Sequence, residues 1–131
     1  MSKTEWMKQA VKLANENEQK HQRAPYGAVV VKDGKVIGSG VNEVTATNDP
    51  TKHAEIQAVR EACQTLNTTN LKGCAIYAST EPCPMCLSTI YYTQMDTVYF
   101  SNPSNPDQDY VYNQLSLSHD EKDIHMIRLE E

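Results

Sequence analysis

The feature that most constrains this chain is the alternation of short strand-like runs with segments of helical periodicity. Two runs rich in β-branched residues, 26–32 and 35–41, flank Asp33-Gly34, a dipeptide that favours the type I′ turn of a β-hairpin. Further strands are expected at 74–79, 97–100 and 124–129. Helices are expected at 2–20, from 51 to 66, from 84 to 92 and around Tyr112 and Leu115.

Strands that alternate with helices predict an α/β fold in which helices cover both faces of one sheet. The connection from 35–41 to 74–79 passes through a helix, as in a parallel crossover. The helices that begin near residues 51 and 84 would then start at the same edge of the sheet, where open α/β sheets bind ligands. The chain has 131 residues, close to the commonest domain size, so 1–131 is expected to be one domain.

Charge and hydropathy narrow the classes of partner. The formal net charge is −5, whereas binding to nucleic acid needs a basic face that releases counterions from phosphates. A small molecule is therefore the favoured partner, and nucleic acid is not expected. Neither a membrane-spanning apolar run nor the apolar core of a signal peptide is found in the sequence, so we expect no membrane partner and a cytoplasmic location.

The four cysteines do not suggest a disulfide framework. A chain of this size can bury a core without disulfides, and a cytosolic setting disfavours them. Cys63 falls on the apolar face of an expected helix and Cys74 within an expected strand, so both are interpreted as core residues. The close pair Cys83 and Cys86 is instead typical of metal binding or redox chemistry.

Two short motifs open two of the expected helices: His53-Ala54-Glu55 and Pro82-Cys83-Pro84-Met85-Cys86. Pro84 at the first helical position would make Cys83 the N-cap and Cys86 the third residue of its helix. A helix N-terminus stabilises a thiolate, which is the form of cysteine that binds metal. Two thiolates and one imidazole suit zinc and leave the fourth tetrahedral position open for water. We therefore expect one zinc ion per chain, bound by His53, Cys83 and Cys86.

Glu55 is expected to be catalytic and not to bind the metal. Zinc can lower the pKa of a bound water to about 7, which provides hydroxide at neutral pH. A hydrolysis at such a metal also needs protons moved to the substrate and to the leaving group, and one carboxylate beside the metal can carry them. A thioredoxin-like redox pair and a closed structural zinc site are the competing interpretations. The former lacks an associated His-x-Glu, and the latter would need two more ligands.

These motifs resemble the signature of the cytidine-deaminase-like zinc deaminases, His-x-Glu followed by Pro-Cys-x-x-Cys. The likeness extends to the guanine deaminase branch through PYGAVVV (25–31), NDPTKHAE (48–55) and EPCPMC (81–86). It implies a three-layer α/β/α sandwich with a mixed five-stranded sheet and a homodimer. It also implies hydrolytic deamination of a free nucleobase in purine metabolism, with guanine to xanthine and ammonia as the first choice. A tRNA adenosine-to-inosine deaminase is the alternative, as is a deaminase of another heterocycle such as cytosine.

The resemblance further implies groups that bind the substrate. Asn42 matches an asparagine whose amide contacts the purine, and Tyr26 matches an aromatic residue at the pocket floor. The backbone N–H of Ala54 would donate to a heteroatom of the substrate. An acidic residue before the late helix is expected to meet the amino edge of guanine, and either Asp107 or Asp109 could supply it; Asp109 is our choice. The competing interpretations are a turn residue for Asn42, a packed strand tyrosine for Tyr26, and a solvated loop acid for Asp107 or Asp109.

The end of the chain departs from the guanine deaminase pattern. Such enzymes continue beyond the last strand with an aromatic-rich segment that closes the pocket, often on a dimer partner. Here the given sequence ends with IHMIRLEE (124–131). We expect one of three explanations: the pocket is closed from elsewhere, with Tyr110 or Tyr112 as the candidates; the substrate differs; or the given sequence is shortened.

Overall fold

The computed structural model describes residues 2–130; residues 1 and 131, the two ends of the predicted domain, lie outside the described part. Its sheet has four strands in the order β2-β1-β3-β4. Their bounds are β1 Gly27–Lys32, β2 Lys35–Val41, β3 Ala75–Thr80 and β4 Thr97–Asn102. β1 runs antiparallel to both β2 and β3, and β3 runs parallel to β4. The sheet is therefore mixed, and β2 and β3 point the same way, which confirms the predicted crossover.

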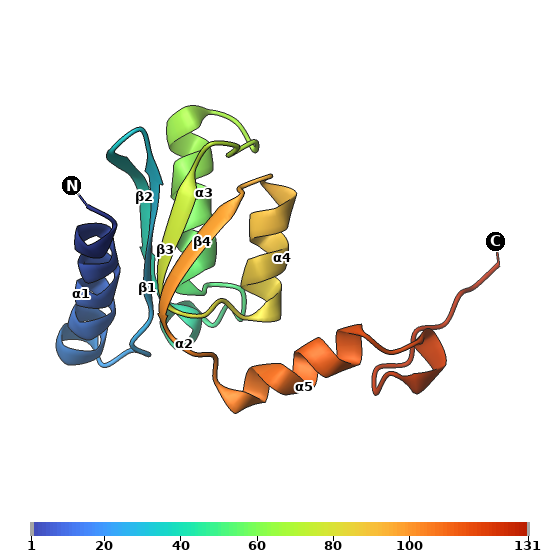
Figure 1. Ribbon diagram of the computed structural model, residues 1–131. Helices are drawn as coiled ribbons and strands as arrows, with labels where there is room; N and C mark the ends of the chain where they lie inside the picture. The colour runs from blue at the N-terminus through green and yellow to red at the C-terminus, as the bar shows by residue number, and fades with distance from the viewer. Residues whose placement is uncertain (1, 131) are drawn as a thin grey trace.

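Helices cover both faces of this sheet (Figure 1). The helix α1 (Lys3–His21) lies on one face, and α3 (Ala54–Leu66) and α4 (Pro84–Tyr92) lie on the other. Because successive side chains of a strand point to opposite faces, the residues of β1 divide between two apolar cores. Ala28 and Val30 pack with α3, whereas Val29 and Val31 pack with α1. The predicted α/β/α sandwich is confirmed.

The predicted fifth strand at 124–129 is wrong. After β4 the chain forms α5 (Pro106–Leu115), which leads away from the sheet, and a short 3-10 helix (His119–Glu121) follows. Ile124, Ile127 and Leu129 are 74–84% exposed. A strand needs a neighbouring strand to satisfy its N–H and C=O groups, and within residues 2–130 no strand reaches this segment. The alternation of apolar residues at 124–129 favours a strand, but within residues 2–130 no neighbouring strand pairs with this segment.

The segment between β2 and α3 also differs from the prediction. The helix was expected to begin near residue 51, but α3 begins at Ala54 with His53 as the N-cap. Asp49 Oδ1 accepts hydrogen bonds from the N–H (2.8 Å) and the hydroxyl (2.7 Å) of Thr51. A further short helix, α2 (Val44–Thr47), lies between β2 and α3, where the sequence analysis expected no element. Because α3 begins at Ala54, His53 lies at the N-terminal end of the helix, next to its first turn.

The helix α3 packs very closely against β2 because two positions of that strand are glycine. A Cβ on Gly40 would lie 2.2 Å from the carbonyl oxygen of Ala54, and a Cβ on Gly38 would lie 2.3 Å from that of Ala58. Any side chain at either position would therefore push the helix away. This contact sets the height of the first turn of α3 above the sheet.

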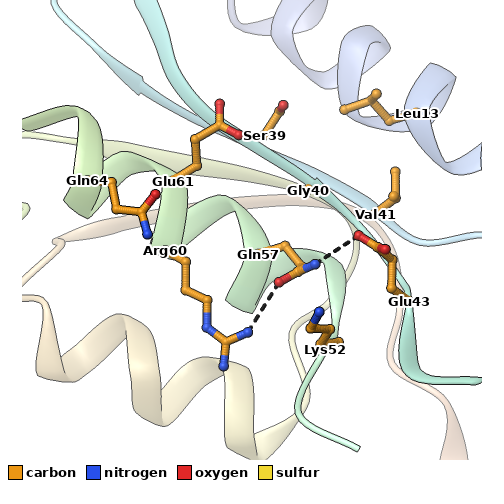
Figure 2. A pocket seen from close by; sticks show the side chains of 10 residues that line it. All are labelled: Leu13, Ser39, Gly40, Val41, Glu43, Lys52, Gln57, Arg60, Glu61 and Gln64. Atoms are coloured by element: carbon orange, nitrogen blue, oxygen red, sulfur yellow. Dashed lines mark hydrogen bonds between the residues drawn. The ribbon is translucent and has the colours of Figure 1, made fainter. Parts of the chain in front are cut away.

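A hollow of about 510 Å³ lies along the outer edge of β2, beside the polar side of α3 (Figure 2). Inside it, Gln57 donates a hydrogen bond to Glu43 Oε1 (2.9 Å) and accepts one from Arg60 (3.3 Å). Its lining includes acidic and basic side chains but neither cysteine nor histidine, so we assign no chemistry to it.

The described helices include none with the length and hydropathy that a membrane span requires.

Candidate metal centre and substrate cavity

The three side chains that were predicted to bind metal come together at the sheet edge where β2 and β3 end. His53 is the N-cap of α3, Cys83 is the N-cap of α4, and Cys86 is the third residue of α4. His53 Nδ1 lies 3.5 Å from the Sγ atom of each cysteine, and all three ligand atoms lie within 4.8 Å of one another. A tetrahedral zinc ion, with Zn–S near 2.3 Å and Zn–N near 2.0 Å, separates nitrogen from sulfur by about 3.5 Å. The three residues therefore fit zinc.

The local electrostatics favour a thiolate at Cys83. The backbone N–H of Cys86 donates to Cys83 Sγ (3.5 Å), and the N-terminus of α4 adds its partial positive charge. The side-chain hydrogen bond from Cys86, followed by the one from His53, lowers the pKa of Cys83 to about 4. The same pairing with Cys83, together with burial, raises the pKa of the Cys86 thiol. Because cysteine binds zinc as the thiolate, metal binding here is coupled to proton release.

Glu55 occupies the second position of α3, directly beside the metal ligands. It is 8% exposed, and burial raises the pKa of its carboxyl to about 7. A carboxyl group with a pKa near neutrality can both accept and donate a proton at pH 7. No lysine or arginine forms an ion pair with Glu55 within residues 2–130. The carboxyl is therefore available for proton transfer.

A cavity of about 110 Å³ opens in front of these groups. It is lined by residues from the ends of three strands, from the starts of two helices and from α5: Tyr26, Asn42, His53, Glu55, Thr80, Glu81, Cys83 and Gln108. Two of the residues implied by the resemblance, Tyr26 and Asn42, thus line the cavity together with Glu55. Ala54 is fully buried between His53 and Glu55. Asp107 and Asp109 are exposed, and neither lines the cavity.

Gln108 is a lining residue that the sequence reasoning missed. Its Oε1 atom is buried and has no hydrogen-bond partner within the described residues. Asn105 caps α5 by accepting a hydrogen bond from the N–H of Asp107 (3.0 Å). With the helix start known, residues four apart share a face, so Gln108 faces the same way as Tyr112. The dipeptide Asn105-Pro106, an N-cap followed by a first-turn proline, was the signal that could have identified this register.

Two contacts attach α5 and the loop before it to the metal-binding loop. The hydroxyl of Tyr112 donates to the carbonyl oxygen of Pro82 (3.1 Å), and the N–H of Ser104 donates to Glu81 Oε1 (3.2 Å). Tyr110 instead hydrogen bonds to Asp123 and is 54% exposed. Neither of the two tyrosines that were expected to close the pocket lines the cavity.

Known proteins are similar to this chain in sequence and in fold. Residues 1–102 match the model of the cytidine and deoxycytidylate deaminase zinc-binding region. The chain is 38% identical over 130 residues to guanine deaminase of Bacillus subtilis, covering 95% of this chain and 83% of that protein. An X-ray structure of guanine deaminase from Bacillus subtilis superposes with a TM-score of 0.94 at 36% identity, covering 100% of this chain and 87% of that one. A tRNA-specific adenosine deaminase of Aquifex aeolicus is 40% identical over 101 residues, covering 77% of this chain and 66% of that protein.

Proposed function

The chain belongs to the family of zinc-dependent cytidine and deoxycytidylate deaminases and is an aminohydrolase of nucleobase-type rings. From this premise we propose that its substrate is free guanine, which reacts with water to give xanthine and ammonia. The observation that carries the proposal is the buried Glu55 carboxyl beside the His53, Cys83 and Cys86 cluster, at one small cavity. Guanine is supported by the likeness to the Bacillus enzyme over 95% of this chain.

The three metal ligands and Glu55 have different roles in the proposed reaction. His53, Cys83 and Cys86 would hold the zinc ion, which supplies an activated water when bound. Glu55 lies outside this ligand set and would carry the protons: one proton of the attacking water would go to a ring nitrogen, and the second would go to the departing amino group, which leaves as ammonia. The pKa of about 7 suits this exchange, because neither the protonated nor the ionised carboxyl is strongly favoured at neutral pH.

The cavity offers binding groups whose polarity matches guanine. Asn42 Oδ1 accepts a hydrogen bond from the N–H of Val44 (3.1 Å), which leaves its Nδ2 to donate to a ring carbonyl. Gln108 lines the same cavity and carries a buried acceptor, Oε1, without a partner among the described residues, and the amino edge of guanine presents N–H donors that could pair with it. We assign this contact to Gln108 in place of Asp109. Tyr26 would support the ring, and the N–H of Ala54 would donate to a heteroatom.

Two observations favour a free base over a nucleotide in RNA. The cavity, at about 110 Å³, is well below the range of about 300–1,000 Å³ typical of sites for drug-sized ligands. The net charge of −5 also disfavours the phosphate contacts on which RNA binding depends. The alternative, deamination of tRNA adenosine, has its support in the 40% identity with the Aquifex enzyme.

A substrate panel tests the choice. Ammonia release would be measured with guanine, adenine, cytosine and an anticodon stem-loop RNA, using the purified zinc-loaded protein and its Glu55→Gln variant as the blank. We expect guanine to have the highest kcat/KM. Turnover of the RNA without turnover of any free base would replace the guanine proposal with the tRNA alternative.

We also propose that the protein is a cytoplasmic homodimer. A reducing compartment preserves thiolate ligands, which supports the location. Exposed apolar side chains on the C-terminal segment (Ile127 at 74%, Leu129 at 84%) and on α4 (Tyr91 at 74%, Tyr92 at 87%) support self-association, because monomers rarely expose so much apolar surface. Light scattering should give twice the chain mass at micromolar concentration, and Ile127→Asp should reduce it. A monomer with full activity would contradict the proposal.

A further inference from the structure

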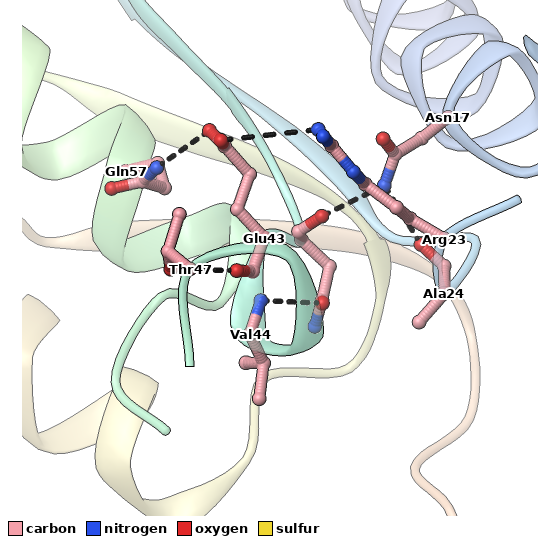
Figure 3. Close-up of polar contacts among 8 residues, drawn as sticks. Asn17, Arg23, Ala24, Glu43, Val44, Thr47 and Gln57 are labelled. Carbon is pink, nitrogen blue, oxygen red and sulfur yellow. Dashed lines mark hydrogen bonds and ion pairs between the residues drawn. The ribbon is translucent and has the colours of Figure 1, made fainter. Parts of the chain in front are cut away.

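Asn17 is a buried polar residue that the proposed reaction does not use. It lies on the inner face of α1 and is 1% exposed. Its Nδ2 donates to two carbonyl oxygens, that of Ala24 (3.0 Å) and that of Asn42 (3.0 Å), as Figure 3 shows. Its Oδ1 has no partner within residues 2–130. A buried acceptor without a partner costs free energy that an apolar side chain would avoid, so the value of this amide lies in its two donated bonds.

Each of these bonds ends on a segment that lines the cavity. The carbonyl oxygen of Ala24 also accepts a hydrogen bond from the N–H of Tyr26 (2.9 Å), and Tyr26 is a lining residue. Asn42 lines the cavity itself, and its Oδ1 is held by the N–H of Val44. One buried amide on α1 therefore connects the segment before β1 to the segment after β2. These are the segments that carry the two side chains proposed to meet the base from the sheet.

A second set of contacts, made by Glu43, holds the segment after β2. Glu43, the residue after Asn42, forms an ion pair with Arg23 (3.9 Å) and accepts a hydrogen bond from Gln57 of α3 (2.9 Å) (Figure 3). The N–H of Glu43 donates to the carbonyl oxygen of Lys52 (2.9 Å). The Arg23 and Glu43 side chains are each about 30% exposed, so their ion pair contributes little alone. The Asn17 side chain, in contrast, is 1% exposed.

We propose that Asn17 is a positioning residue for substrate binding. It touches no substrate and acts through the backbone of Asn42, and secondarily through that of Ala24 on Tyr26. The inference rests on the proposed function, in which the Asn42 amide contacts the base. A hydrogen bond weakens steeply when its donor is misaligned, so the direction of Asn42 Nδ2 decides how well the base is held. Asn17 keeps that direction by fixing the main chain from which the amide projects.

A double-mutant cycle separates positioning from a structural role. Asn17→Leu keeps the number and branching of the side-chain heavy atoms but cannot donate, and Asn17→Ala is a smaller second variant that α1 should tolerate. Either change should lower kcat/KM for the base about tenfold, mainly through KM, with zinc content unchanged. Combined with Asn42→Ala, the loss should be at least about fivefold smaller than the product of the two single losses. Asn15→Ala, on the exposed side of the same helix, is the matched control and should leave kcat/KM unchanged.

A readout independent of turnover keeps the test decisive. The N–H groups of Val44 and Tyr26 report the two held segments, and their hydrogen exchange should be about tenfold faster in Asn17→Leu than in Asn15→Ala. The N–H groups in the middle of α3 should be unaffected. Unchanged exchange at both positions, or losses in the cycle that simply multiply, would overturn the assignment. If the wild-type protein deaminates no free base, the proposed function fails, and the exchange rates alone then decide whether Asn17 positions these segments.

Discussion

Replacing Gly40 with alanine should damage catalysis far more than its effect on stability suggests. The new Cβ would lie 2.2 Å from the carbonyl oxygen of Ala54 and 2.6 Å from the nitrogen of Ala58, whereas ordinary contacts begin near 3.4 Å. Both atoms belong to the backbone of α3, so no side chain can rotate away to make room. The helix and β2 must separate locally by about 1 Å.

The structure gives the size of both effects. Overpacking of this kind costs about 1–3 kcal/mol of unfolding free energy. For a chain of this length that corresponds to a fall in Tm of roughly 3–15 °C. Ala54 lies between His53 and Glu55 in the chain, so the same shift displaces a residue of the metal-binding cluster and the proposed proton carrier together. A displacement of about 1 Å at reacting groups can cost about 100-fold in rate, and we expect a loss of that order in kcat/KM.

Gly38→Ala is the matched control. Its Cβ would meet the carbonyl oxygen of Ala58 at 2.3 Å and the nitrogen of Ala62 at 2.7 Å, which is the same clash one turn farther from the metal ligands. Calorimetry should therefore give both variants a similar fall in Tm. Ammonia release at a temperature where both are folded should give Gly38→Ala less than about a tenfold loss. Equal losses of activity in the two variants would refute the idea that the height of the first turn of α3 matters for catalysis.

Three further changes address the site directly. Glu55→Gln should retain zinc by metal analysis but lose about 10²–10⁴-fold in kcat, because the amide cannot carry protons; activity within threefold of wild type would exclude Glu55 as the proton carrier. Cys83→Ser should lose tightly bound zinc and activity together. A chelator should inactivate the wild-type protein, and added zinc should restore the activity of the wild type but not that of the variant. A chelated protein that stays fully active would exclude metal catalysis. Gln108→Leu should raise KM for guanine about tenfold, while Asp109→Leu should leave it unchanged; the reverse result would return the contact to Asp109.

The metal cluster could be predicted from the sequence because its geometry is local. Pro84 sets the start of α4, which makes Cys83 the N-cap and brings Cys86 into the first turn. The hairpin at Asp33-Gly34 is equally local, since both residues adopt the positive φ angles that a type I′ turn requires. The acidic net charge and the order of strands and helices are likewise properties of the residues themselves. These features yielded the α/β class, the zinc ligands and the role proposed for Glu55.

The tertiary structure alone decided where distant segments meet. The alternation at 124–129 has strand propensity, but a strand forms only where a partner strand is within reach, and α5 carries this segment away from the sheet. Gln108 lines the cavity and Asp109 does not because of how α5 is rotated, and the contact of Tyr112 with Pro82, 30 residues away, helps to fix that rotation. The link from Asn17 to Asn42 joins residues 25 positions apart. Local rules govern caps and turns, whereas only the packed chain determines which of several similar side chains faces the cavity.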